Sequence, residues 1–341
     1  MIPAPYLVGA LAVFLAAALA ALPLDEQSFL SPKEPGSIRI LFVGDMLFDR
    51  SIRQAMEKFG GDFIFSCIAS TLAEADAVVA NLEGPITSNA SMSIGSKPGG
   101  PNNYTFTFPL STAALLARHN ITVVNLGNNH IRNFGIKGVE ETIRALRNAG
   151  VSFFGDPLEN TVAYEEIAGI RFAFINYNEF DASSTASSTI ARIRLAREAG
   201  AVPIVYTHWG NEYEKHPPEW IRKLAHRFVD AGAEIVIGSH PHVIGESEVY
   251  GSTPPTLLGT STLTTGGSTT LTTGGSTTLT TGKGKYIYYS LGNFIFDQYW
   301  DKDVRTGLLL DVQFNSAGVV SVAELRVYLE KDRRTCPIRK S

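Results

Sequence analysis

The sequence of 341 residues has little cysteine, no excess of positive charge and, near its N-terminus, no charge at all. It carries 29 Lys and Arg residues against 33 Asp and Glu residues, which gives a formal net charge of −4. Because a basic surface is the usual mark of nucleic-acid binding, we expect no nucleic-acid partner. The two cysteines, Cys67 and Cys336, have no spacing typical of a metal site and support a disulfide only weakly.

The N-terminal segment, residues 2–24, contains no charged side chain and consists mostly of Ala, Leu, Val and Phe. At about 1.5 Å per residue, such a helix is long enough to cross the roughly 30 Å apolar core of a bilayer. Two interpretations stay open: an uncleaved membrane anchor, or a signal peptide cleaved near Ala18-Leu19-Ala20. The rest of the chain would then lie at the outer face of the cell membrane, or be secreted if the signal is cleaved.

Composition divides the chain into four regions. We expect the signal or anchor at residues 1–24, a polar linker at 25–36, one domain at 37–330 and a polar tail at 331–341. Inside the domain, residues 252–282 are rich in Thr, Gly and Ser and repeat with a period of eight. Such a tract buries too little apolar surface to offset its ordering entropy, so we expect a flexible insertion.

Apolar runs separated by helical patterns predict the fold class. Five runs rich in Val and Ile are typical of buried strands. They are residues 38–44, 77–82, 121–127, 202–207 and 235–239. The repeated strand–helix units indicate an α/β fold with a parallel sheet. Residues 246–250 and 286–290 alternate like half-buried antiparallel strands. Residues 308–314 and 319–328 predict a hairpin with its turn at Ser316-Ala317-Gly318, so we expect a β-rich C-terminal part.

Each of the five runs is followed by a residue that can bind a metal ion. These residues are Asp45, Glu83, Asn128-Asn129-His130, His208 and His240-Pro241-His242. Parallel sheets bind ligands at the carboxyl ends of their strands, so we expect these side chains to meet at one sheet edge. Oxygen and imidazole donors suit Mn, Fe or Zn. The sequence therefore predicts a divalent-metal site and a hydrolytic, phosphoesterase-like activity.

Each of these residues also has a purely structural interpretation. Asp45 could cap the helix that follows it, and Asn128-Asn129 could form a turn. A lone residue such as His208 is usually structural or exposed. The pair His240 and His242 is the strongest local signal, because two buried imidazoles without partners would be costly and the proline between them fixes the backbone.

Taken in order, six motifs resemble the CapA family of capsule-synthesis proteins, which is associated with poly-γ-glutamate production. The motifs are Gly44-Asp45, Asn81-Leu82-Glu83, Asn128-Asn129-His130, His208-Trp209-Gly210 with Glu212-Tyr213, Ser239-His240-Pro241-His242 and Tyr289-Ser290-Leu291-Gly292-Asn293-Phe294. The resemblance covers residues 38–328 apart from the Thr/Gly/Ser tract. That family is similar to calcineurin-type metallophosphoesterases, which implies a metallophosphatase-like layered sheet with flanking helices.

The resemblance also implies how the residues divide their roles. One metal position would be held by Glu83, Asn129, His208 and His240. A second would be held by Asp45, Glu83 and His242. The wider pattern opens with Asp-x-His, but Leu47 stands in the place of that His, so we expect one tight ion and a second that is weak or absent. His130 matches the catalytic proton donor. Four residues are expected to contact substrate: Asn81, Asn128, Glu212 and Asn293.

Two functions remain open from the sequence. The first is a metal-dependent hydrolase outside the membrane that cleaves a phosphoester, or an amide or γ-glutamyl bond. The second is a non-catalytic subunit that binds the anionic polymer poly-γ-glutamate and assists a membrane synthase or exporter. The row of ligands favours the hydrolase. A polymer-binding subunit should show a basic groove, for which the motifs offer only Arg50, Lys97, Arg132 and Arg305.

Overall fold

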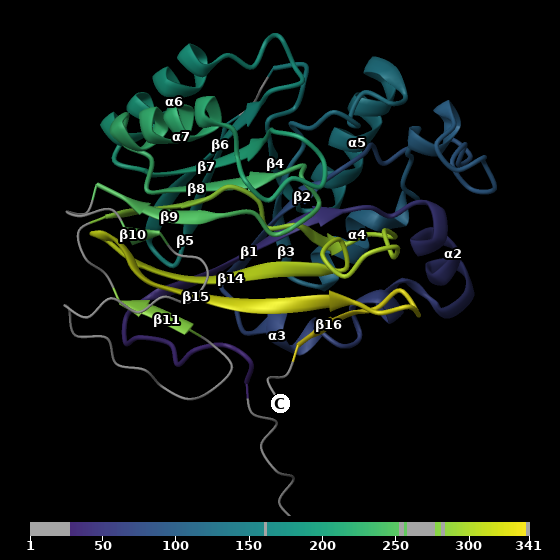
Figure 1. Ribbon diagram of the computed structural model, residues 1–341, viewed down its shortest axis with the longest axis horizontal. Coiled ribbons are helices and arrows are strands. Elements are labelled where there is room, and N and C mark those ends of the chain that lie inside the picture. Colours follow the sequence, from purple (N-terminus) through teal and green to yellow (C-terminus); the bar gives the residue numbers. More distant parts are fainter. Residues whose placement is uncertain (1–27, 160–161, 252–255, 258–276, 281–283, 339–341) are drawn as a thin grey trace, which may run out of the picture.

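The computed structural model describes residues 28–159, 162–251, 256–257, 277–280 and 284–338 (Figure 1). The predicted N-terminal membrane segment and most of the predicted insertion lie outside these residues. Within the described residues, no helix is long and apolar enough to span a bilayer. The described parts of the insertion form two short strands, β10 (Thr256–Leu257) and β11 (Thr277–Thr280).

The first sheet has the strand order β11-β15-β14-β1-β2-β3-β4, with β13 beside β1 and β16 beside β15. Its remaining strands are β1 (Ile38–Met46), β2 (Ala77–Leu82), β3 (Ile121–Asn125), β4 (Ser152–Phe154), β13 (Asn293–Ile295), β14 (Thr306–Asn315), β15 (Gly318–Leu329) and β16 (Thr335–Pro337). Strands β1 to β4 are parallel, and β14 and β15 form an antiparallel hairpin. This hairpin confirms the predicted β-rich C-terminal part.

The second sheet has the order β10-β9-β12-β8-β7-β6-β5. Its longer strands are β5 (Ala163–Ile167), β6 (Ile170–Asn178), β7 (Val202–His208), β8 (Ile235–Ser239), β9 (Ser247–Tyr250) and β12 (Lys285–Tyr288). Strands β6, β7, β8 and β12 are parallel, and the antiparallel strands β5 and β9 lie outside them.

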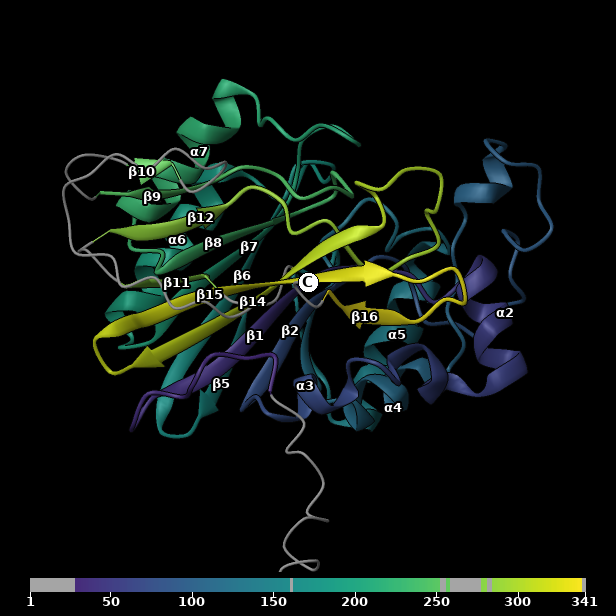
Figure 2. The same ribbon diagram turned by 60° about the horizontal axis from the view of Figure 1, so that its bottom comes forward.

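The two sheets stack face to face between two layers of helices (Figures 1 and 2). Alternation along β1 shows why: Leu41 and Val43 pack on the helical side, whereas Ile40 and Phe42 face the second sheet. The first sheet is covered by α2 (Arg50–Phe59), α3 (Ala69–Ala73), α4 (Ser111–Arg118) and α5 (Gly135–Ala149). The second is covered by α6 (Ala186–Glu198) and α7 (Glu219–Asp230). The predicted α/β layered fold with flanking helices is confirmed.

The polar segments at both ends of the domain pack against it. Before β1, Ser31 Oγ donates to Asp311 Oδ2 at 2.7 Å. After β15, the strand β16 returns along it, and Cys336 forms a disulfide with Cys67. Within the predicted polar tail, residues 335–337 are thus held to the domain by a β-ladder and a covalent bond. The disulfide that the sequence supported only weakly is present.

Candidate metal centre

Polar residues at the carboxyl ends of β1, β2, β7 and β8 converge at one end of the stacked sheets. Asp45 and Glu83 come from the first sheet, and His208, His240 and His242 come from the second. The sequence predicted one edge of one sheet. The structure brings the residues together at the facing ends of two sheets, because β7 and β8 belong to a sheet of their own.

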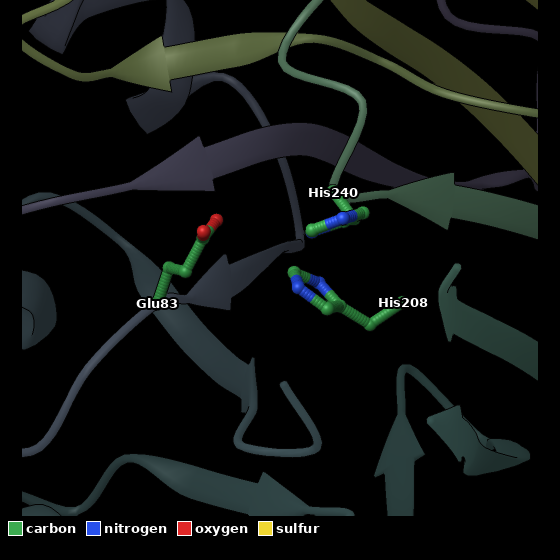
Figure 3. A group of neighbouring side chains, drawn as sticks. All are labelled: Glu83, His208 and His240. Atoms are coloured by element: carbon green, nitrogen blue, oxygen red, sulfur yellow. The ribbon is translucent and has the colours of Figure 1, made fainter. Parts of the chain in front are cut away.

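Within the described residues, two groups of three side chains could each hold a metal ion. One consists of Glu83, His208 and His240 (Figure 3). The other consists of Asp45, Glu83 and His242, and in each group the ligand atoms lie within 4.8 Å of one another. All five side chains are buried. Glu83 belongs to both groups, and a carboxylate can serve two ions because each of its oxygens can bind one.

Unusual backbone conformations place two of these side chains, and a close backbone approach places a third, Asp45. His240 and His242 have φ values of 96° and 58°, in the left-handed region that non-glycine residues rarely adopt. The His240 N–H donates to Asp45 Oδ2 at 3.2 Å. On β1, a Cβ added to Gly44 would lie 1.8 Å from the carbonyl oxygen of Gly292. Only glycine therefore lets the end of β1 approach the loop that carries the motif around β13.

Hydrogen bonds assign the proton on His208. Ser239 Oγ lies 2.7 Å from the carbonyl oxygen of Thr207, which can only accept, so the hydroxyl donates there. His208 Nδ1, 2.9 Å from the same Oγ, must then donate to it. Burial, aided by neighbouring histidines, holds the pKa of His208 well below its usual value, so Nε2 has a free lone pair. His208 Nε2 lies 2.9 Å from Asn129 Oδ1. Both atoms are acceptors, so a cation between them could bind to both.

His242 has its proton assigned in the same way. Asn293 Nδ2 donates to two other oxygens, each at 2.9 Å, so its Oδ1 accepts from His242 Nδ1 at 2.9 Å. His242 Nε2 lies 3.5 Å from Glu83 Oε1. Burial acts to lower the pKa of His242, but the Glu83 and Asp45 carboxylates outweigh it and raise the pKa to about 9. The two carboxylates thus favour positive charge here.

Two buried atoms of the centre accept or donate no hydrogen bond in the described part of the chain: His240 Nδ1, and Glu83 Oε1, whose contact with His242 Nε2 at 3.5 Å is an ion pair. An unpaired buried polar group costs about 1–3 kcal/mol. Burial also raises the pKa of the Glu83 carboxyl well above its usual value, against the opposing effect of His242. A divalent cation would remove both costs, and carboxylate and imidazole ligands suit Zn, Mn or Fe. The residues present therefore fit a metal ion.

His130 lies beside the centre with its ring 4.3 Å from that of Phe106. The Asn133 Nδ2, which donates to a backbone carbonyl at 2.7 Å, is 3.3 Å from His130 Nδ1. Since that amide nitrogen donates, the His130 proton resides on Nε2. Burial, together with the charges of His242 and His240, lowers the pKa of His130 to about 3. The imidazole is therefore neutral near pH 7 and presents an N–H, not the imidazolium of a conventional general acid.

The four residues expected to contact substrate differ in exposure. Asn81, Asn128 and Asn293 are buried and hydrogen-bonded within the protein. Of the four, only Glu212 is exposed. The sequence did not single out Phe180, whose ring lies 4.4 Å from that of His240 and is 45% exposed at the mouth of the centre.

The sequence of the chain is similar to those of known proteins. Residues 39–298, which contain all of these side chains, match the family described as bacterial capsule synthesis protein PGA_cap. The chain is 25% identical over 318 residues to the capsule biosynthesis protein CapA of Bacillus anthracis, covering 86% of this chain and 69% of that protein. It is 24% identical over 318 residues to the PGA biosynthesis protein CapA of Bacillus subtilis (strain 168), covering 88% and 73%. A probable polyglutamine synthesis accessory protein of Mycobacterium tuberculosis (strain CDC 1551 / Oshkosh) is 26% identical over 160 residues, covering 39% of this chain and 42% of that protein.

Proposed function

Because the chain belongs to the bacterial capsule synthesis protein PGA_cap family, we propose that it is a metal-dependent hydrolase of capsule polymer synthesis. Its target would be a phosphoester, or an amide or γ-glutamyl bond. The proposal is carried by the two buried ligand groups, in which Glu83 Oε1 and His240 Nδ1 form no hydrogen bond within the described residues. A protein that only bound a polymer on its surface would gain nothing from buried polar atoms that lower its stability.

We assign the ligands to two metal positions that differ in their affinity for the ion. The first position takes Glu83, Asn129, His208 and His240. The second takes Asp45, Glu83 and His242. At the place where the wider pattern has another His, Leu47 is fully buried in the apolar core. The first position should therefore hold its ion more tightly. A bound divalent ion would polarise the scissile bond and lower the pKa of water.

The other side chains bind and orient the substrate. His130 presents its Nε2–H to a substrate oxygen, and its ring is held by Phe106 on one side and Asn133 on the other. As a neutral imidazole it stabilises developing negative charge by hydrogen bonding, and an anionic substrate would raise its pKa towards that of a proton donor. Glu212 and Phe180 contact the part of the substrate outside the buried centre.

We further propose that the protein works at the outer face of the cell membrane, with residues 1–24 as its anchor or cleaved signal. The Cys67–Cys336 disulfide supports this location, because such bonds persist in oxidising compartments. There it would meet an anionic polymer such as poly-γ-glutamate and a membrane synthase complex. The names of the two Bacillus relatives, which refer to capsule and PGA biosynthesis, support a role in making such a polymer.

The test combines elemental analysis with a panel of phosphoester and γ-glutamyl substrates. The wild type should retain about one tight divalent ion, and His240→Ala should lose it because one of four ligands is gone. His130→Ala should keep the ion and lose ~100-fold or more in turnover. His216→Ala, at an exposed histidine outside both groups, serves as the control.

Three results would contradict parts of the proposal. Equal metal content in the wild type and His240→Ala would overturn the ligand assignment. Two tightly bound ions in the wild type would contradict the proposed difference in affinity between the two metal positions. Retained metal without hydrolysis of any tested substrate would favour the non-catalytic, polymer-binding subunit.

A further inference from the structure

Three buried asparagines stand in line behind the metal centre. Asp45, Asn81 and Asn125 occupy paired positions on β1, β2 and β3. Asn176 lies on β6 of the second sheet. The three asparagines are at most 2% exposed. A buried amide is costly unless both of its ends are hydrogen-bonded, whereas an aliphatic residue would suit a buried strand at no such cost. Packing alone does not account for three amides here.

The amides form one continuous chain of hydrogen bonds. Asn176 Nδ2 donates to Asn125 Oδ1 at 2.9 Å. Asn125 Nδ2 donates to Asn81 Oδ1 at 3.0 Å. Asn81 Nδ2 then donates to Asp45 Oδ1 at 2.8 Å and to Glu83 Oε2 at 3.3 Å. The chain therefore runs from the second sheet, across the first, to both carboxylates of the centre.

Backbone groups fix the direction of this chain. Asn176 Nδ2 also lies 3.2 Å and 3.4 Å from the carbonyl oxygens of Gly127 and Tyr206, which can only accept. Asn125 Oδ1 also accepts from the Gly127 N–H at 3.1 Å, which can only donate. Rotating the side-chain amide of Asn125 or Asn176 by 180° would place a donor against a donor or an acceptor against an acceptor. Every amide in the chain therefore directs its N–H groups towards the carboxylates.

The backbone at Gly127 leaves the space that the chain needs. A Cβ at this position would lie 2.2 Å from Asn176 Oδ1 and 2.4 Å from its Nδ2. Any larger residue would displace the first amide of the chain. Gly127, the strand register and the three asparagines are thus all needed for this chain of hydrogen bonds.

We propose that Asn125 and Asn176 are positioning residues, which act through Asn81 to hold the Asp45 and Glu83 carboxylates in the orientation that receives metal. This inference rests on the proposed metal-binding function. Hydrogen bonds in a chain polarise one another in a buried environment, so loss of an early member weakens the last bond. Side chains behind the ligands of a metal typically change its affinity 10–100-fold.

The test titrates Mn²⁺ by calorimetry into the wild type, Asn125→Leu and Asn176→Leu. The control is Asn120→Ala at the other end of β3, where Asn120 Nδ2 donates to two backbone carbonyls, both at 2.9 Å. All three variants should melt at a lower temperature. Only the two leucine variants should bind Mn²⁺ 10–100-fold more weakly. If their dissociation constants lie within twofold of the wild-type value, the asparagines are structural and the positioning role is wrong.

A second measurement needs no metal. In the metal-free wild type, the side-chain NH₂ group of Asn81 should be protected from solvent exchange in NMR spectra. Asn125→Leu should shift its signals and speed its exchange, whereas Asn120→Ala should not. A wild type that binds no Mn²⁺ would refute the metal proposal alone. In that case unchanged Asn81 signals in Asn125→Leu would refute the positioning role, and changed signals would support it.

Discussion

Breaking the disulfide between Cys67 and Cys336 should lower the free energy of unfolding by several kcal/mol. The two residues are 269 positions apart, so the bond closes a loop that contains most of the chain. For a loop of this size, the chain-entropy relation gives a loss of about 19 cal/mol/K in the unfolded state, or about 5.6 kcal/mol at 25 °C. Residual structure in the unfolded chain reduces the effect, so we expect about 3–6 kcal/mol.

The assay is guanidinium unfolding followed by circular dichroism, with and without a phosphine reductant. The double variant Cys67→Ala/Cys336→Ala is the matched control. Reduction should move the wild-type midpoint to that of the double variant and leave the double variant unchanged. If the oxidised and reduced proteins unfold at the same denaturant concentration, the entropic argument is refuted.

Three further predictions concern buried charge, the shared ligand and targeting. Arg39→Leu should lower the free energy of unfolding by about 3–5 kcal/mol, because it leaves the buried carboxylate of Asp311, now 3.0 Å from the guanidinium, without a charged partner. Arg39→Leu/Asp311→Leu should recover much of that loss in the same denaturation assay, and equal instability of single and double variants would contradict this. Glu83→Gln should remove metal from both positions in elemental analysis, whereas an ion retained by the other ligands would show that Glu83 is not shared. Residues 1–36 fused to a reporter should carry it to or across the membrane, and a cytosolic reporter would argue against targeting.

The pattern of strand ends was sufficient to find most of the centre. Asp45, Glu83, His208 and the His240–His242 pair each follow a Val- and Ile-rich run, and parallel strands end at the same level. The hairpin of β14 and β15 was also predicted, from two strand-like segments on either side of the turn Ser316-Ala317-Gly318. These features depend on local sequence and on a general rule of sheet geometry.

What the sequence could not show depends on contacts between distant segments. From the sequence, Asn125 is only one residue within an apolar run. Nothing nearby in the sequence shows that the side chain of Asn176 lies against it. The same holds for Cys67 and Cys336. The stacking of two sheets is a further example: strand patterns identify β7 and β8, but both sheets contain parallel strands with the same pattern, so the pattern does not assign a strand to either sheet.

The described segment before β1 packs on the part of the first sheet that lies away from the ligands. Ser31 Oγ donates to Asp311, which pairs with Leu41 on β1, and Lys33 forms an ion pair with Asp76, just before β2 begins. Glu83 follows the other end of β2, seven residues beyond Asp76, or roughly 23 Å at about 3.3 Å per residue. With residues 1–24 as the anchor that we propose, the chain would join the domain on the side away from the ligands. The centre would then face material that has left the membrane surface.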